Sequence, residues 1–501
     1  MVFTVVLITL ACITVSYFVW NYCRPFFVRK EITLPGPRKL YTNFLRKNTD
    51  EFLNIINSLG FYYPSPFQIK LNYTPLVIIY EPDQVKDFLQ NRDNLDKNLL
   101  YKFTEHIFGM GLLTAPESIW AHSRKAIARN FNPITLREFF NIFVERSLML
   151  MNKLEKVGLN GKEFTSFMHL KTSALEIALD TMMGIKQADL KTINLYVESA
   201  EKIKNILRRR MYSTWIMNEL SFYNFIFNNF YALGHEQKKV IKSLGSLTDM
   251  MTQHQLYGTH GEHTNKTKNH TNKTFFEMML KTFSKKNFTE KLIRDNMITL
   301  LLTATDSIGV TLNFVVFMLA NFSEIQEKVY KELTEIYGTT SVKSTPIKYE
   351  DLQHMNYLDR VIKETMRLFP TIPLVGRKLK EDMKIGEYII PKNTNVTIAF
   401  MLMYRNEKYW PDPLKFDPDR FLPKRLKDNQ LSYFAPFSDG PRNCIGMRYA
   451  MTSMKVILAT LVRTFVLKVD EHIPINKIKL QTDITISPIK PFKIRIEKRN
   501  L

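Results

Sequence analysis

A single cysteine stands in a loop-like stretch of ten residues, FSDGPRNCIG at positions 437–446, directly before a helix-like run at 447–465. A cysteine at the start of a helix faces free backbone N–H groups and the positive end of the helix dipole, which lower its pKa. We therefore expect Cys444 to be a thiolate that binds a soft metal. No second cysteine lies nearby in the sequence, so a zinc site with several thiolates, or an iron–sulfur cluster, lacks its ligands.

A second group of reactive side chains lies in the middle of a long apolar stretch, at about 289–321. Thr303, Ser307 and Thr311 recur every four residues, so a helix places them on one face, next to Asp306. An ionisable group in the middle of this stretch argues against contact with lipid, and a carboxyl beside hydroxyls suits proton transfer. The alternative is that the hydroxyls bond back to the carbonyls four residues earlier.

The pattern Phe-x-x-Gly-x-Arg-x-Cys-x-Gly resembles the haem-binding loop of the cytochromes P-450. Four further motifs of that family precede it in this chain, and the five occur in the family's order. The resemblance covers nearly the whole chain and extends to arthropod-type microsomal members of family four. It implies a haem b whose iron is bound by Cys444. It also implies cofactor contacts from Trp120 and Arg124, four residues apart on one helix, and from Arg377, Phe437, Arg442 and Gly446.

Glu364 and Arg367 form a Glu-x-x-Arg pair in a helix that we expect to end at Pro370. By itself an i,i+3 pair contributes only about 0.2–0.5 kcal/mol. The resemblance implies that Arg420, in a downstream Pro-Asp-Arg-Phe segment, joins the pair in a buried network that supports the haem loop. The family usually has Glu where this segment has Asp419.

The stretch at about 289–321 resembles the distal helix of the cytochromes P-450, which lies over the haem, but it departs from the family pattern at three positions. Ala304 replaces a glycine, so the helix is expected to open less readily to seat dioxygen. Ser307 replaces a threonine but keeps a hydroxyl that can hold a water or pass a proton. Many family-four ω-hydroxylases have a glutamate at the position of Thr303 that is esterified to the haem. Threonine cannot form that bond, so we expect the haem to be held non-covalently.

The implied function is that of a haem-thiolate monooxygenase. It inserts one oxygen atom from O2 into a fatty acid, another lipid, a hormone-like lipid or a xenobiotic. Electrons come from an NADPH-dependent flavoprotein reductase, with cytochrome b5 as a candidate second donor. Asp306, Ser307 and Thr303 are the catalytic candidates, and substrate contacts are expected from about 108–113, the distal helix and 372–375. Two alternatives stay open: an isomerase or dehydratase of oxygenated lipids, and a haem-binding protein without turnover.

The composition fits a cytosol-facing enzyme with a basic surface. The formal charge is +22, and no nucleic-acid motif accompanies it. A basic face for an acidic electron donor is the preferred interpretation, inferred for Lys125, Arg442, Arg448 and Lys455. Of three cysteines, Cys12 and Cys23 lie in or beside the N-terminal apolar segment, so the body can form no internal disulfide.

The fold class expected from the resemblance is mainly α with a smaller β region, a single globular domain behind an N-terminal membrane anchor. Residues 1–22 are apolar enough to cross a bilayer, and the cations that follow place the body in the cytosol, at the endoplasmic reticulum membrane. A basic, proline-rich hinge at 23–40 and an oxygenase domain at 41–501 complete the expected organisation. Residues 67–80 alternate like a β-hairpin.

Two stretches in the middle of the chain allow more than one interpretation. Residues 205–231 combine three arginines with a dense aromatic run, which fits either a buried helix or a channel mouth that dips into the membrane. Residues 252–274 contain four histidines among polar residues and three glycosylation sequons. We interpret this stretch as a surface loop instead of a metal site, with sequons unused in the cytosol.

Overall fold

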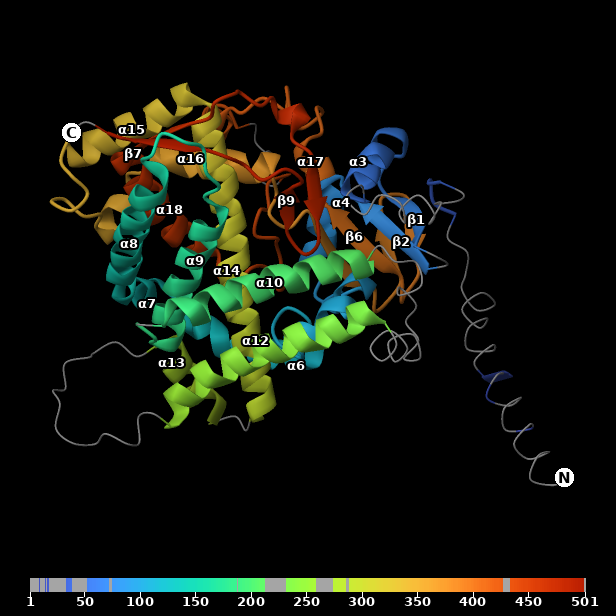
Figure 1. The fold of residues 1–501 in the computed structure, drawn as a ribbon. Helices are drawn as coiled ribbons and strands as arrows, with labels where there is room; N and C mark the ends of the chain where they lie inside the picture. The colour runs from blue at the N-terminus through green and yellow to red at the C-terminus, as the bar shows by residue number, and fades with distance from the viewer. Residues whose placement is uncertain are drawn as a thin grey trace.

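The fold is that of a computed structural model, which describes residues 9, 14, 16, 17, 33–37, 52–71, 74–186, 188–211, 231–257, 274–284, 288–426 and 433–499. The expected membrane anchor at 1–22, most of the hinge at 23–40, the aromatic run at 212–230 and the loop at 258–273 lie outside these residues. Figure 1 shows a helical body with a small sheet region at one side of it.

Helices make up most of the described chain. In order, they are α3 (Phe52–Tyr62), α4 (Pro82–Gln90), α5 (Glu105–Phe108), α6 (Glu117–Ile127), α7 (Pro133–Glu138), α8 (Phe140–Gly158), α9 (Phe167–Ala178), α10 (Leu190–Met211), α12 (Ala232–Tyr257), α13 (Phe275–Ser284), α14 (Glu290–Asn321), α15 (Ser323–Tyr337), α16 (Asn356–Leu368), α17 (Phe400–Tyr404) and α18 (Met447–Thr464). Short single-turn helices include η1 (Leu99–Thr104), η2 (Ala128–Asn130), η3 (Leu179–Met183), η4 (Tyr349–Gln353), η5 (Pro418–Phe421) and η7 (Ile475–Lys477).

The long helix α14 runs through the middle of the molecule (Figure 1). Its first turn is capped by Thr289, whose side-chain oxygen accepts a hydrogen bond from the Leu292 amide at 3.3 Å. Among the described residues it is the one helix long and apolar enough to span a membrane, yet 78% of its most apolar window is buried inside the protein. It is therefore the central core helix, as expected from the charge of Asp306.

Helix α9 packs closely against α14 because Gly309 has no side chain. A Cβ at Gly309 would lie 2.5 Å from the Lys171 Cγ and 3.1 Å from the Lys171 Cα. The missing methyl group lets the backbone of α9 approach and carries Lys171 to the middle of α14, one turn from Asp306. This contact fixes the position of the buried Lys171 ammonium, which pairs with Asp306.

The main sheet has four strands in the order β1 (Phe67–Leu71), β2 (Thr74–Ile79), β6 (Asn395–Ala399) and β3 (Leu374–Lys378). β1 and β2 form the expected antiparallel hairpin, and β2 pairs in parallel with β6. Three two-stranded sheets join β4 (Met383–Ile385) with β5 (Tyr388–Ile390), β7 (Phe465–Lys468) with β10 (Arg495–Lys498), and β8 (Leu480–Thr482) with β9 (Ile486–Pro488).

The proline-rich segment at 33–37 docks on the first strand of this sheet. The Gln68 amide donates to the Pro35 carbonyl at 2.8 Å, and Leu34 is buried. A Cβ at Gly36 would lie 2.0 Å from the Gln68 carbonyl oxygen, so only glycine allows this approach. The segment thereby fixes where the chain joins the globular body.

The fold class predicted from the sequence is confirmed, since the described chain is a single, mainly helical globular domain with small sheets. Helices were also placed correctly at α6, α14 and α18, and the bounds of α14 and α18 lie within one residue of those expected. The domain boundaries at residues 22 and 40 stay predictions.

Candidate active site

An internal cavity of about 280 Å³ lies between α14, the loop before α18 and the segment at 97–113. Its walls are mostly apolar. The cavity brings together ten of the thirteen residues selected from the sequence: Trp120, Arg124, Thr303, Asp306, Ser307, Arg377, Phe437, Arg442, Cys444 and Gly446. The other three, Glu364, Arg367 and Arg420, form a separate buried cluster.

The loop before α18 is shaped to present the Cys444 thiol to this cavity. The Cys444 amide donates to the Phe437 carbonyl at 2.9 Å, which closes the loop on itself. Ser438 and Gly440 adopt φ values of +62° and +69°. A Cβ at Gly440 would lie 1.9 Å from the Leu89 carbonyl oxygen, so the loop requires glycine there. Gly446 then caps the first turn of α18.

The sequence analysis expected a lowered pKa for Cys444, and the protein groups alone do not produce it. Burial raises the pKa of the thiol, while a hydrogen bond from the Gly446 amide and the charge of Arg124 act in the opposite direction. The expectation was wrong because the helix-dipole argument left out the cost of desolvating a thiolate. A metal ion bound to sulfur supplies the missing stabilisation, since a coordinated thiol is deprotonated outright.

One wall of the cavity gathers three cations, Arg377, Arg442 and Lys97. Among the described residues, no carboxylate lies within ion-pair distance of any of the three. Burial and the charge of Arg377 lower the pKa of Arg442 to about 9. Burial, with Arg377 and Arg442, holds the pKa of Lys97 well below its usual range. Two buried guanidiniums and a half-buried ammonium that lack a carboxylate partner are costly, so this wall fits an acidic ligand.

The Arg442 side chain is oriented for such a ligand. Its guanidinium lies 4.6 Å from the centre of the Trp120 ring. Nη1 donates to the Leu112 carbonyl at 3.5 Å and Nη2 to the Ala115 carbonyl, whereas Nε is buried and has no hydrogen-bond partner. A free N–H on a stacked guanidinium suits a haem carboxylate.

Sequence reasoning missed two residues of this wall, Lys97 and Tyr101. The Lys97 Nζ lies 4.3 Å from the centre of the Tyr101 ring, and burial raises the pKa of Tyr101 while the charge of Arg377 opposes that shift. Both residues line the cavity. Lys97 stands between Asp96 and Asn98, where a lysine is usually solvated, so the sequence alone carries no signal for it.

Arg124 is engaged with the cysteine loop. Its two terminal nitrogens donate to the Asn443 carbonyl at 2.9 Å and to the Asn443 Oδ1 at 2.6 Å. Trp120 and Arg124 share one face of α6, as their spacing predicted. In this structure Arg124 therefore fixes the residue before Cys444, and its contact with a haem carboxylate stays a prediction.

On the part of the cavity wall formed by α14, Asp306 is held by two lysines and a threonine. Its Oδ1 lies 2.7 Å from the Lys171 Nζ and 2.9 Å from the Lys204 Nζ, and its Oδ2 accepts a hydrogen bond from Thr485 at 2.8 Å. Burial alone would raise the pKa of Asp306, but the two lysines hold it well below its usual range. Asp306 is therefore an ionised, fully paired carboxylate. Sequence reasoning named none of its three partners.

The hydroxyls beside Asp306 bond back along α14, as the alternative interpretation stated. Thr303 donates to the Thr299 carbonyl at 2.6 Å, and Ser307 donates to the Thr303 carbonyl at 2.7 Å. Each oxygen keeps its lone pairs for a donor in the cavity. Thr311 also lies 2.7 Å from the Thr371 hydroxyl. The roles of Thr303 and Ser307 in proton transfer stay predictions.

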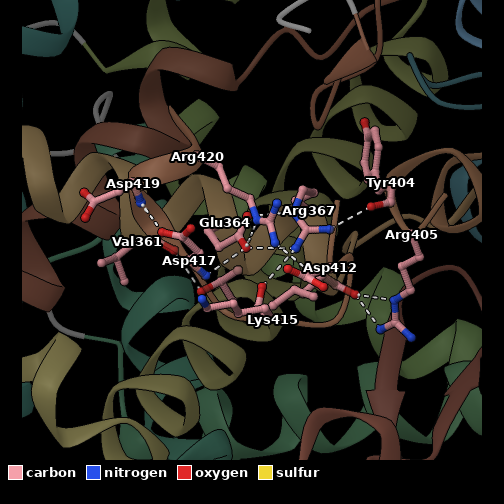
Figure 2. A network of polar contacts seen from close by, with 12 residues as sticks. Val361, Glu364, Arg367, Tyr404, Arg405, Asp412, Lys415, Asp417, Asp419 and Arg420 are labelled. Atoms are coloured by element: carbon pink, nitrogen blue, oxygen red, sulfur yellow. Dashed lines mark hydrogen bonds and ion pairs between the residues drawn. The ribbon is translucent and has the colours of Figure 1, made fainter. Parts of the chain in front are cut away.

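The structure brings Glu364, Arg367 and Arg420 together in one cluster. Figure 2 shows the Glu364 carboxylate between the two guanidiniums. Arg367 Nε donates to Glu364 Oε2 at 2.6 Å, and Arg420 Nε lies 3.3 Å from Oε1. The Asp417 amide also donates to Oε1, at 3.0 Å. Burial raises the pKa of Glu364, and the two arginines oppose that shift.

Two of the four cations inferred as a docking face do not serve that purpose in this structure. Arg442 is buried in the cavity wall. Lys455 is bound 2.9 Å from the Asp359 carboxylate. Lys125 and Arg448 are exposed. The assignment failed because sequence does not tell whether a cation near a motif faces a cavity or the solvent.

The thiol, the three unbalanced cations and the free Nε of Arg442 together fit a haem, with its iron at Cys444 and its carboxylates at the cationic wall. A cavity of this kind defines a haem-thiolate enzyme. Comparison with known proteins agrees. The family model for cytochrome P450 matches residues 33–496 of this chain.

Curated relatives cover most of the chain as well. Cytochrome P450 4V2 of Rattus norvegicus is 30% identical over 497 residues, which cover 96% of this chain and 91% of the relative. Cytochrome P450 4c21 of Blattella germanica is 32% identical over 436 residues, covering 85% and 84%. A probable cytochrome P450 4s3 of Drosophila melanogaster is 28% identical over 446 residues, covering 86% of each.

The chain belongs to the cytochrome P450 family. The resemblance to family-four members inferred from the sequence is confirmed, and the relatives include both mammalian and insect proteins. It is a haem-containing monooxygenase, which takes electrons from a redox partner that draws on NADPH and acts on a lipophilic substrate with O2.

Proposed function

We propose that this enzyme hydroxylates a C–H bond of a membrane-derived lipophilic substrate, such as a fatty acid or another lipid, or of a xenobiotic. The observation that carries the proposal is the cavity beside Cys444, whose walls near α14 are apolar except for Asp306, Lys204 and a row of hydroxyls. Apolar walls bind a hydrocarbon chain by removing it from water.

The haem, when bound, supplies the activation of O2, and the thiolate of Cys444 favours cleavage of the O–O bond. The protein residues bind and orient the other participants. Leu300, Ala304 and Ile484 line the cavity and exclude water from the reacting bond. The Ser307 oxygen has lone pairs free to hold a water on the cavity side of α14, so it is the residue we assign to proton delivery.

Asp306 has a different part in this proposal. Because it is ionised and paired with Lys171 and Lys204, it does not itself carry a proton at neutral pH. Its Oδ1 instead binds the Lys204 ammonium, which lines the cavity, at 2.9 Å. We assign to Asp306 the positioning of this ammonium at the cavity wall.

For electron supply we propose an NADPH-dependent flavoprotein reductase at the endoplasmic reticulum membrane, with the domain facing the cytosol. The support is the apolar segment at 1–22 with Arg24, Arg29 and Lys30 after it, and the overall charge of +22. Of the docking cations inferred from the sequence, we keep the exposed Lys125 and Arg448.

The test is the reduced carbon monoxide difference spectrum of the membrane-expressed protein, recorded with dithionite and then with reductase and NADPH. A red-shifted thiolate band under both conditions is expected, followed by oxygenated products in a screen of fatty acids and lipophilic xenobiotics. A band with dithionite and none with reductase would favour the isomerase or the non-catalytic binder. Cys444→Ala should abolish the band, and an unchanged band would contradict the ligand assignment.

A further inference from the structure

The segment at 108–115 forms one wall of the cavity through Phe108, Leu112 and Leu113. It contains no secondary structure beyond the end of α5 and a run of turns. Such a segment holds one conformation only if its backbone polar groups are satisfied by other parts of the protein. Two side chains at the start of α14 do this.

Asp295 and Asn296 accept hydrogen bonds from the backbone of this segment. The Met110 amide donates to Asp295 Oδ2 at 2.8 Å, and the Leu112 amide donates to Asn296 Oδ1 at 3.1 Å. Asp295 is 6% exposed and Asn296 is fully buried. The Asn296 side chain is itself oriented, because its Nδ2 donates to the Leu292 carbonyl at 2.8 Å.

Two glycines let the segment lie against α14. A Cβ at Gly109, where φ is +53°, would lie 2.2 Å from Asp295 Oδ2, and a Cβ at Gly111 would lie 2.0 Å from the Thr299 hydroxyl oxygen. Side chains at either position would push the backbone beyond hydrogen-bond distance of α14. The two glycines allow the close approach, and Asp295 and Asn296 then hold the segment against α14 by hydrogen bonds.

The same segment is also held from the side of the cysteine loop. Arg442 donates to the Leu112 and Ala115 carbonyls. Leu112 thus has its amide bound to α14 and its carbonyl bound to the arginine of the cationic wall. Its side chain, which lines the cavity, is positioned by both.

We propose that Asp295 and Asn296 are positioning residues that set the distance between the 108–113 wall and α14, and so determine which ligand lengths and shapes fit beside the iron. Neither residue lines the cavity, so neither touches a ligand there. Their effect passes through the Met110 and Leu112 amides, and it requires haem binding but no particular substrate.

The experiment uses the full-length haem-loaded protein and two ligands that bind iron through the same imidazole nitrogen. Imidazole is small enough to be insensitive to the 108–113 wall, whereas 1-dodecylimidazole must lie along it. Each ligand is titrated while the shift of the Soret band is followed. The ratio of the two dissociation constants is the readout, because a general loss of stability would not change it selectively.

For Asp295→Ala and Asn296→Ala we expect the imidazole dissociation constant to change less than twofold and that of 1-dodecylimidazole to rise about tenfold, the fold-change that corresponds to about 1.4 kcal/mol. Asp295→Asn keeps an oxygen acceptor and should restore the wild-type ratio. Asp249→Ala is the matched control, because it removes the carboxylate that pairs with Arg294, one residue before Asp295, without touching the segment. It should keep the wild-type ratio.

An unchanged ratio in both alanine variants would overturn the proposal, as would equal weakening of both ligands. If the alanine variants fail to retain haem, a second measurement on the wild type tests the proposal. Hydrogen exchange of the wild-type holoenzyme should show slow exchange at the Met110 and Leu112 amides, and fast exchange at both would also overturn it. Loss of oxygenase activity plays no part in either readout, so failure of the proposed function would leave this test valid.

Discussion

The Asp306 carboxylate lies 2.7 Å from the ammonium of Lys171, and this pair joins the central helix α14 to α9 inside the protein. Lys171 is fully buried. Lys204 of α10 and Thr485 of the β8–β9 turn bind the same carboxylate, so one side chain connects four parts of the fold beside the cavity. A buried charge of this kind is stable only while its partners remain.

Asp306→Ala should therefore destabilise the fold strongly. The substitution leaves Lys171 and Lys204 buried without this carboxylate, and the loss of one member of a buried ion pair costs about 3–5 kcal/mol. Denaturant unfolding followed by circular dichroism measures the loss. A double variant, Lys171→Met with Asp306→Leu, replaces charge by apolar groups and should recover part of it. A loss below about 1 kcal/mol in Asp306→Ala would show that the cluster does not bear on stability.

The pH dependence of stability should reveal the same cluster. The folded-state pKa of Asp306 lies below the unfolded value of about 3.9, so its contribution is complete above about pH 5 and is lost as the pH falls below about 4. The free energy of unfolding of the wild type should then approach that of Asp306→Asn by about 1.4 kcal/mol per pH unit. Denaturant unfolding of both proteins between pH 3 and 7 tests this, and a constant difference across the range would contradict it.

Ser307→Ala should uncouple NADPH oxidation from product formation. The Ser307 oxygen is the hydroxyl next to Asp306 on the cavity side, and its removal takes away the group proposed to hold a water there. Product per NADPH should fall about tenfold or more, with hydrogen peroxide in its place. Thr305→Val is the control, since Thr305 is buried on the same helix but does not line the cavity. If NADPH oxidation stays fully coupled to product formation in Ser307→Ala, proton delivery must be assigned to Thr303 or to water instead.

The parts of the site that could be predicted from the sequence are those whose residues lie close together along the chain. The loop around Cys444 needs glycine for its turn, and the helix after it begins within three residues. Trp120 and Arg124 are four residues apart, so helical geometry alone puts them on one face. Asp306 was recognised because a charge in the middle of an apolar helix requires a partner.

The partners of Asp306 could not be predicted, because they lie far away along the chain. Lys171 is 135 residues from Asp306 and Thr485 is 179 residues from it. A lysine in a helix is usually solvated, and only tertiary packing shows otherwise. One signal was present, since Lys171 lies at helical spacing from the buried Ala174, Leu175 and Ala178, on the apolar face of α9. Lys97 lies in a polar stretch with no periodic apolar pattern, so its sequence context did not indicate a place in the cavity wall.

Helix α16 contains a fully buried carboxylate, Glu364, and a partly exposed one, Asp359, and each forms ion pairs. Glu364 and Arg367 are both fully buried, and their pairing includes two hydrogen bonds of 2.6 and 2.8 Å. Asp359, five residues earlier, is 21% exposed and pairs with Lys363 and Lys455, so solvent screens its charges only in part.

Glu364→Ala should lower the free energy of unfolding by about 3–5 kcal/mol, because it leaves Arg367 and Arg420 facing each other without a carboxylate. Asp359→Ala, the control on the same helix, should cost less than Glu364→Ala, because solvent partly screens the charges of Asp359 and its two lysines. Arg367 also donates to the Tyr404 carbonyl at 2.7 Å, and the Tyr404 hydroxyl accepts from the Ala435 amide, just before the cysteine loop. Haem content measured by absorbance should therefore fall in Glu364→Ala and not in Asp359→Ala. Equal losses in the two variants would mean that the buried network does not support the loop.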